Sequence, residues 1–349
     1  MSRRVRWRIC LAAGIWAACT AQTILAPGPL PTRVGQVLSW LPADTETILV
    51  ANTSFALPGF KQQDATTAGG ETDLTNRFEL LPLILFRFRK DGLLQNYLMG
   101  QRVEFAIEGS RHFRRPAGEG EVPYEGCEIA FLAEAATGRG DAFLRQAAPA
   151  TLRVESIAGQ RMAVFEERRE EDTWTTFVTF PKANLILACT NRDFLREVLE
   201  RIGGKAGRRA LSNTLAEWKF IVSDAPFWGF RHYDRSQADR DPSSPFVDRN
   251  IIGMADKQAR GIAFRFDPKM GNVVTISYFS STGDILGYLQ KTPLSMKIVG
   301  VVDPAANLPV SYRQVAPGVA EIRYELGGIL PVDVFIAVAW GAFGHAFYF

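Results

Sequence analysis

The chain has 349 residues, of which 47% are hydrophobic and 22% are charged, and its formal net charge is +3. This balance is that of a folded globular chain and excludes disorder as its general state. Acidic and basic residues alternate, as in the run from Glu166 to Asp172, so no continuous basic track follows a nucleic-acid backbone, and we expect no nucleic-acid partner.

Residues 1–21 have the pattern of an export signal. Arginines between Arg3 and Arg8 precede an apolar block from Ile9 to Ala18, and small residues follow. The block is shorter than the roughly 20 residues that span a bilayer as a helix, which favours a cleaved signal over a retained anchor. Twin-arginine and lipoprotein signals stay open as alternatives. The pattern predicts that the mature chain folds outside the cytoplasm.

Residues 22–37 contain prolines at alternating positions, which predicts an extended leader. The folded part is expected to open at residue 38, with a first strand from Thr47 to Ala51, where aliphatic and β-branched residues lie between turn formers. Between Leu74 and Leu98, apolar residues recur every three or four positions, which is typical of a helix.

Residues 38–235 read as an α+β domain. Helices are expected from Asp141 and from Asn191 to Ile202, the second followed by two glycines. Short turn sequences separate neighbouring apolar runs, which predicts antiparallel hairpins. The expected strands are Arg102 to Gly109, Gly126 to Ala133, Thr151 to Ile157, Arg161 to Glu167, Thr173 to Phe180 and Asn184 to Thr190.

The remaining chain divides by composition. Residues 236–258 are rich in Asp, Arg, Ser and Pro and predict a linker or long loop, and residues 259–330 form a second strand-rich region. The strands expected there are Gly261 to Phe266, Asn272 to Ser280, Met296 to Val302, Val310 to Val315 and Val319 to Leu326.

Residues 331–349 form an apolar C-terminal segment. From Val334 to Phe349 it is shorter than a full membrane helix, and two interpretations stay open: a final buried element, or a segment associated with a membrane surface.

Cysteines and histidines give no metal or cofactor motif. Cys127 and Cys189 each lie in a strand-like run, and in an oxidising compartment they either pair or stay as buried thiols. His112, His232 and His345 lie far apart, with no neighbouring ligand at zinc-binding spacing. We therefore expect neither a bound metal nor a cofactor.

A dense group of aromatic residues is the candidate ligand-binding region. Such rings line an apolar groove or, more commonly, close a core between sheet and helix, and a binding surface should be sought here first. The candidate residues are Trp218, Phe220, Phe227, Trp228, Phe230 and Tyr233.

Acid–base catalysis has only generic candidates. Asp234 lies beside His232, and a hydrolase with a dispersed site would need His232 or His112 to meet a carboxylate in a pocket. The chain has no serine elbow, metal motif or phosphate-binding glycine loop, so no catalytic residue is assigned.

Several phrases of the chain resemble a group of uncharacterised bacterial exported proteins. They are Leu41-Pro42-Ala43-Asp44-Thr45, the strand Ile48 to Val50, the stretch Ala188 to Leu195, and Trp218 to Trp228. The resemblance covers roughly residues 38–235 and implies antiparallel strands that alternate with short helices. It implies no activity and carries no catalytic residue.

Together these patterns predict an α+β architecture of antiparallel sheets with helices packed on one face. The function that we expect is that of a non-enzymatic exported or envelope-associated protein, periplasmic or held at the envelope, which binds a protein partner, a membrane surface or an apolar ligand. The alternatives are a periplasmic hydrolase with a dispersed site and a membrane-complex subunit anchored by residues 334–349. The sequence leaves the oligomeric state open.

Overall fold

The computed structural model describes residues 30–52, 103–115, 124–135, 140, 143–144, 153–169, 172–232, 259–267, 273–281, 283, 285–287 and 310–325. Within these ranges the chain forms one antiparallel sheet of 12 strands with two α-helices. The expected α+β class, with helices packed on one face, is therefore wrong, and the described chain is mainly β. Most strands pair with the strand that precedes or follows them in the chain. Because antiparallel neighbours can be joined by short hairpins, the sheet needs few helices as connections.

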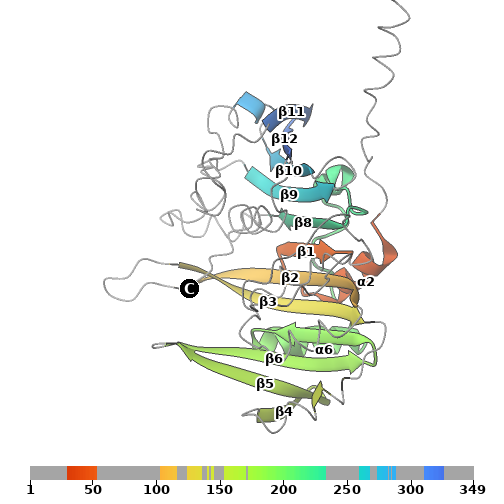
Figure 1. The fold of residues 1–349 in the computed structure, drawn as a ribbon, viewed down its shortest axis with the longest axis vertical. Helices are drawn as coiled ribbons and strands as arrows, with labels where there is room; N and C mark the ends of the chain where they lie inside the picture. Colours follow the sequence, from red (N-terminus) through yellow and green to blue (C-terminus); the bar gives the residue numbers. More distant parts are fainter. Residues whose placement is uncertain are drawn as a thin grey trace, which may run out of the picture.

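The strand order is β11-β12-β10-β9-β8-β1-β2-β3-β7-β6-β5-β4, and Figure 1 shows the strands stacked in this order from the blue end to the green end. The strands are β1 (Thr47–Ala51), β2 (Val103–Arg115), β3 (Tyr124–Ala135), β4 (Arg153–Ile157), β5 (Gln160–Arg169), β6 (Asp172–Lys182), β7 (Leu185–Cys189), β8 (Phe227–His232), β9 (Ala259–Asp267), β10 (Val273–Ser280), β11 (Val310–Ala316) and β12 (Val319–Glu325).

Eleven of these strands confirm predicted strand positions, although β2 continues to Arg115, beyond the expected end at Gly109. Three predicted elements lie wholly or partly outside the described residues. They are the strand from Met296 to Val302, the helix between Leu74 and Leu98, and the helix that begins at Asp141. Strand β8 was not predicted, because its aromatic run was interpreted as part of the candidate ligand-binding region.

One sheet includes strands from both sides of residues 236–258, which lie outside the described residues. Strand β8 precedes this segment and pairs antiparallel with β9, which follows it. The division of the chain into a domain at 38–235 and a second region at 259–330 stays a prediction.

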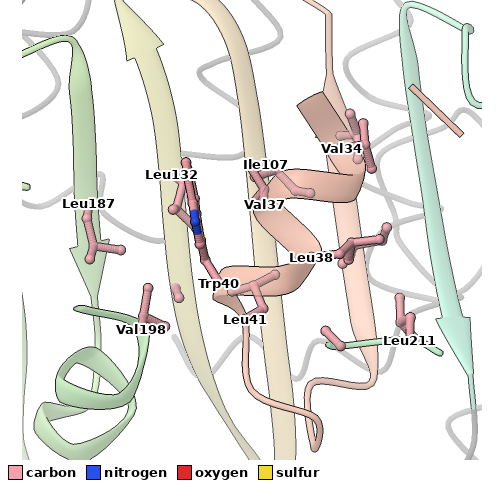
Figure 2. Packing of buried hydrophobic residues seen from close by; sticks show 14 of the residues in the cluster. Val34, Val37, Leu38, Trp40, Leu41, Ile107, Leu132, Leu187, Val198 and Leu211 are labelled. Carbon is pink, nitrogen blue, oxygen red and sulfur yellow. The ribbon is translucent and has the colours of Figure 1, made fainter. Parts of the chain in front are cut away.

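Helix α2 (Thr32–Trp40) begins inside the segment that was expected to be an extended leader. Pro31 directly precedes the helix, a position that proline tolerates because its missing N–H has no partner inside the helix. Val34, Val37 and Leu38 are buried at helical spacing in one cluster with strand residues, and Figure 2 shows the Trp40 ring beside Leu132.

Helix α6 (Arg192–Ile202) confirms the helix predicted from the local sequence. Its N-cap is Asn191, whose side chain accepts hydrogen bonds from the backbone N–H groups of Asp193 and Phe194 at 2.8 and 3.0 Å. The apolar side of the helix, which includes Phe194 and Val198, is buried in the same hydrophobic cluster as helix α2.

The central strands are buried on both faces. Ile48 and Val50 of β1 belong to the cluster under α2, whereas Leu49 points to the opposite face and is also buried. All five residues of β1, and all five of β7, are buried. Burial on both faces explains why these strands are continuous apolar runs rather than alternating ones.

Candidate functional site

The candidate binding aromatics are divided between two elements and do not line one groove. Two lie on the short 3₁₀ helix η2 (Ala216–Phe220) and three on β8. In chain order the described ones are Trp218, Phe220, Phe227, Trp228 and Phe230. The sixth candidate, Tyr233, lies outside the described residues.

The three β8 aromatics are core residues. Phe227 is 1% exposed, and Trp228 and Phe230 are fully enclosed. Alternation along the strand places Trp228 and Phe230 on the α2 face, whereas Phe227 points to the other face and packs against Phe264, with ring centroids 5.2 Å apart. These rings therefore support a surface rather than forming one.

Trp218 and Phe220 are half-buried and rest on this aromatic core. The Trp218 ring meets Phe230 edge-on, with centroids 5.1 Å apart, and Phe220 lies 6.2 Å from Phe279. Phe279 also meets Phe230 edge-on at 6.1 Å, so the four rings form one connected stack. The Trp218 indole Nε1 donates a hydrogen bond of 2.8 Å to the Ser212 carbonyl, which fixes the ring orientation.

Arg209 joins the preceding loop to η2. Its guanidinium lies over the Trp218 ring, 5.8 Å from the centroid, which is a cation–π arrangement. The same group donates hydrogen bonds to the carbonyls of Ala210 and Leu211 at 3.3 and 3.0 Å. Partial burial lowers the pKa of Arg209 below its usual value. The loop and the Trp218 side chain therefore hold each other in place.

A buried carboxylate meets a histidine beside this stack. Oε1 of Glu217 lies 3.2 Å from Nδ1 of His232, and the Glu217 side chain is 7% exposed. Burial alone would raise the pKa of Glu217, but its contacts with His232 and with its own backbone, together with the nearby charge of Arg260, lower it below the usual value. The pair fastens η2 to the end of β8.

This pair is a histidine–carboxylate contact that the sequence did not reveal. The predicted neighbour of His232 was Asp234, which lies outside the described residues, as does the His112 side chain. Glu217 is remote in sequence, and only the folding of η2 onto β8 brings it there. Among the described residues, no hydrogen bond is recorded between this pair and a serine, threonine or cysteine side chain.

Replacement of Glu217 by glutamine is expected to reduce the amount by which the free energy of unfolding falls at acidic pH. Because the folded-state pKa of Glu217 is lowered, its carboxylate contributes stability above about pH 4.3, and this contribution is lost as the pH falls through the folded value. Urea unfolding between about pH 6 and about pH 3 should show a smaller decrease in unfolding free energy for Glu217→Gln than for the unaltered chain. Asp224→Asn, which changes an exposed carboxylate nearby, is the control, and equal slopes for all three proteins would contradict the prediction.

A second polar cluster secures helix α6. Arg111 forms ion pairs with Glu128 and, at 3.2 Å, with Asp44, and Asn191 Nδ2 donates to Glu128 at 2.6 Å. Burial alone would lower the pKa of Arg111, but these carboxylates raise it. The Arg111 guanidinium also lies over the Phe194 ring at 4.6 Å. These contacts join β2, β3 and the start of helix α6.

Cys189 lies beside this cluster as a buried free thiol. Burial raises its pKa to about 12, and its Sγ donates a hydrogen bond to the Asn191 carbonyl at 3.3 Å. A thiol with so high a pKa is a poor nucleophile at neutral pH.

The described residues contain no group of three or more His, Cys, Asp or Glu side chains arranged to hold a metal ion. In the same part of the chain, no helix combines the length and the apolar character needed to cross a bilayer. The C-terminal segment 331–349 lies outside the described residues.

Comparison with known proteins adds little to this geometry. No family model matches the chain, and no curated protein matches it. Among solved structures, the chain is similar to crystal form I of TP0453, with a TM-score of 0.47 and 10% sequence identity, over 87% of this chain and 97% of that one. A likeness this weak carries no conclusion about function.

Proposed function

We propose that the chain is an exported, envelope-associated protein without catalytic activity, which binds an apolar ligand or a partner at the surface formed by Trp218 and Phe220. The observation that carries the proposal is the four-ring stack, in which enclosed Phe230 and Phe279 support two half-buried rings. Large rings held in fixed orientations bind apolar groups at a low cost in side-chain entropy. The N-terminal pattern supports the exported location.

The hydrolase alternative has less support. Its one favourable observation is the contact between Glu217 and His232, but Glu217 is buried, and no hydrogen bond from the pair to a hydroxyl or thiol is recorded among the described residues. A contact of this kind explains the attachment of η2 without any chemistry. The membrane-subunit alternative depends on residues 334–349, and envelope fractionation of a chain ending at Leu330 tests it: unchanged membrane recovery would reject these residues as the anchor.

The export part of the proposal is tested by the mass and location of the protein recovered from its own cells. We expect a chain that lacks residues 1–21 and that separates with the envelope or periplasmic fraction. An intact chain, signal included, in the cytosolic fraction would contradict the proposal.

The binding part is tested with a neutral apolar fluorophore, N-phenyl-1-naphthylamine. We expect saturable fluorescence enhancement that is weakened about tenfold by Phe220→Ser, because a half-buried aromatic contact with the probe is lost. Val154→Ser is the matched control, since Val154 is an apolar residue of the remote strand β4 that is 39% exposed. Equal affinities for both variants, with unchanged circular dichroism, would reject this surface as the binding site.

A further inference from the structure

The aromatic pair on η2 lies in a basic surrounding. Arg209, stacked over Trp218, connects η2 to the glycine-rich loop that follows helix α6, and this loop carries exposed Lys205 and Arg208. Lys219 is exposed between Trp218 and Phe220. We call Lys205, Arg208, Trp218, Lys219 and Phe220 together the basic aromatic surface.

Most of the positive charge on this surface is not neutralised by neighbouring carboxylates. Lys205 pairs with Glu200 at 2.5 Å. In the described part of the chain, Arg208 and Lys219 form no ion pair with an acidic side chain. Glu217, the acidic residue of η2, is buried against His232 and directed away from solvent. Lys219 is therefore the one charged residue of η2 that is exposed to solvent.

The backbone that carries Arg208 is fixed before any partner binds. Arg201 Nη1 donates a hydrogen bond of 2.8 Å to the Arg208 carbonyl and approaches the Leu41 carbonyl at 3.4 Å. Arg201 Nη2 pairs with Glu197 at 3.0 Å, and the loop passes so close to Arg201 that a Cβ on Gly207 would lie 2.9 Å from its guanidinium. Little ordering entropy is lost when a surface fixed in this way binds.

Cations next to half-buried aromatic rings match the interfacial zone of an anionic bilayer. Indole and phenyl rings settle at the depth of the headgroups, and lysine and arginine extend their charged ends toward lipid phosphates. We propose that the basic aromatic surface docks the protein on an anionic phospholipid membrane. This inference rests on the proposed function, because an exported chain meets the lipid surfaces of the envelope, and it specifies the apolar partner as lipid.

The test is sedimentation with vesicles of phosphatidylcholine alone and with vesicles that contain one third phosphatidylglycerol. All proteins are full chains with the same terminal segments, so that any binding by those segments is common to every sample. We expect binding that requires phosphatidylglycerol and that weakens with added salt. Arg208→Gln should weaken it about fivefold, the effect of one cation near an anionic surface.

The matched control is Arg161→Gln. Arg161 is also an exposed arginine, but it lies on β5, and five strands separate β5 from β8 in the sheet. The control should bind like the unaltered chain. Equal affinities for Arg208→Gln and Arg161→Gln, or equal binding to the neutral vesicles, would overturn the inference.

The two proposals fail in different ways. If Phe220→Ser weakens binding of the neutral fluorophore while Arg208→Gln leaves vesicle binding unchanged, only the lipid inference is overturned, and the partner is apolar but not an anionic membrane. If the intact chain is found in the cytosol, the proposed function fails whatever the vesicle result.

Discussion

Replacement of Trp228 by alanine is expected to lower the free energy of unfolding by about 3–5 kcal/mol, the usual loss for a large aromatic ring in a core. Trp228 is fully enclosed and belongs to the cluster that helices α2 and α6 share with the sheet. It lies on β8, between β1 and β9, so the cavity would open at the centre of the sheet. Urea unfolding followed by circular dichroism measures the loss.

Trp228→Phe is the matched variant for this prediction. The indole Nε1 of Trp228 finds no hydrogen-bond partner among the described residues, so phenylalanine removes an unsatisfied donor while keeping an aromatic ring. We expect a clearly smaller loss of stability than for alanine. If the two variants were equally unstable, cavity formation would not be the cause, and the assignment of Trp228 to the packed core would be in doubt.

Alanine at Gly261 is expected to destabilise the protein by about 1–3 kcal/mol, the usual cost of forcing extra volume into a packed site. A Cβ on Gly261 would lie 2.5 Å from the backbone carbonyl oxygen of Arg231, and 3.5 Å from the Cα atom of His232. Because the nearest atom belongs to the backbone of β8, the two strands must separate to make room. The thermal unfolding midpoint should fall accordingly.

Gly35→Ala is expected to change the stability of the protein in the opposite direction. Gly35 lies inside helix α2, and a Cβ there would meet only a side-chain atom of Leu30, at 4.0 Å. Alanine should stabilise the helix by about 0.5–1 kcal/mol, because it restricts the unfolded chain and favours the helical conformation. A midpoint that fell for both variants by the same amount would show that steric contact with β8 is not the cause at Gly261.

Elements encoded by nearby residues could be predicted from the sequence. Helix α6 combines its capping residue Asn191, an apolar stripe and a glycine after its end, all within one short segment. Strand β1 lies where it was predicted because its five residues are apolar or β-branched and turn residues bound it. Such signals lie within a few neighbouring residues, so they can be recognised without knowledge of the tertiary structure.

The fold class could not be predicted in this way. Runs of strands and amphipathic helices fit an α+β arrangement as well as a single sheet, since pairing partners are chosen by the whole chain. The pairing of β8 with both β1 and β9 joins strands separated by residues 236–258. No local pattern in the sequence specifies that pairing, and the aromatic run of β8 fitted either the lining of a groove or, more commonly, a core between sheet and helix.

The burial of the candidate aromatic residues could not be predicted from the sequence for the same reason. The sequence indicated an aromatic region between Trp218 and Phe230, but it could not separate the enclosed rings from the half-buried ones. That distinction depends on which face of the sheet each side chain enters. The contact of Glu217 with His232 and the stacking of Arg209 on Trp218 also needed the folded chain, because each joins separate segments.

The sequence by itself determined the pattern of an export signal, the positions of most strands and the capped helix α6, because each depends on the order of neighbouring residues. Only the tertiary structure decided that the strands form one sheet and that Trp228 supports the core. It also placed Trp218 and Phe220 against the core cluster and Arg209 over the Trp218 ring. The physical reason is that burial and charge compensation are properties of surfaces brought together from distant parts of the chain.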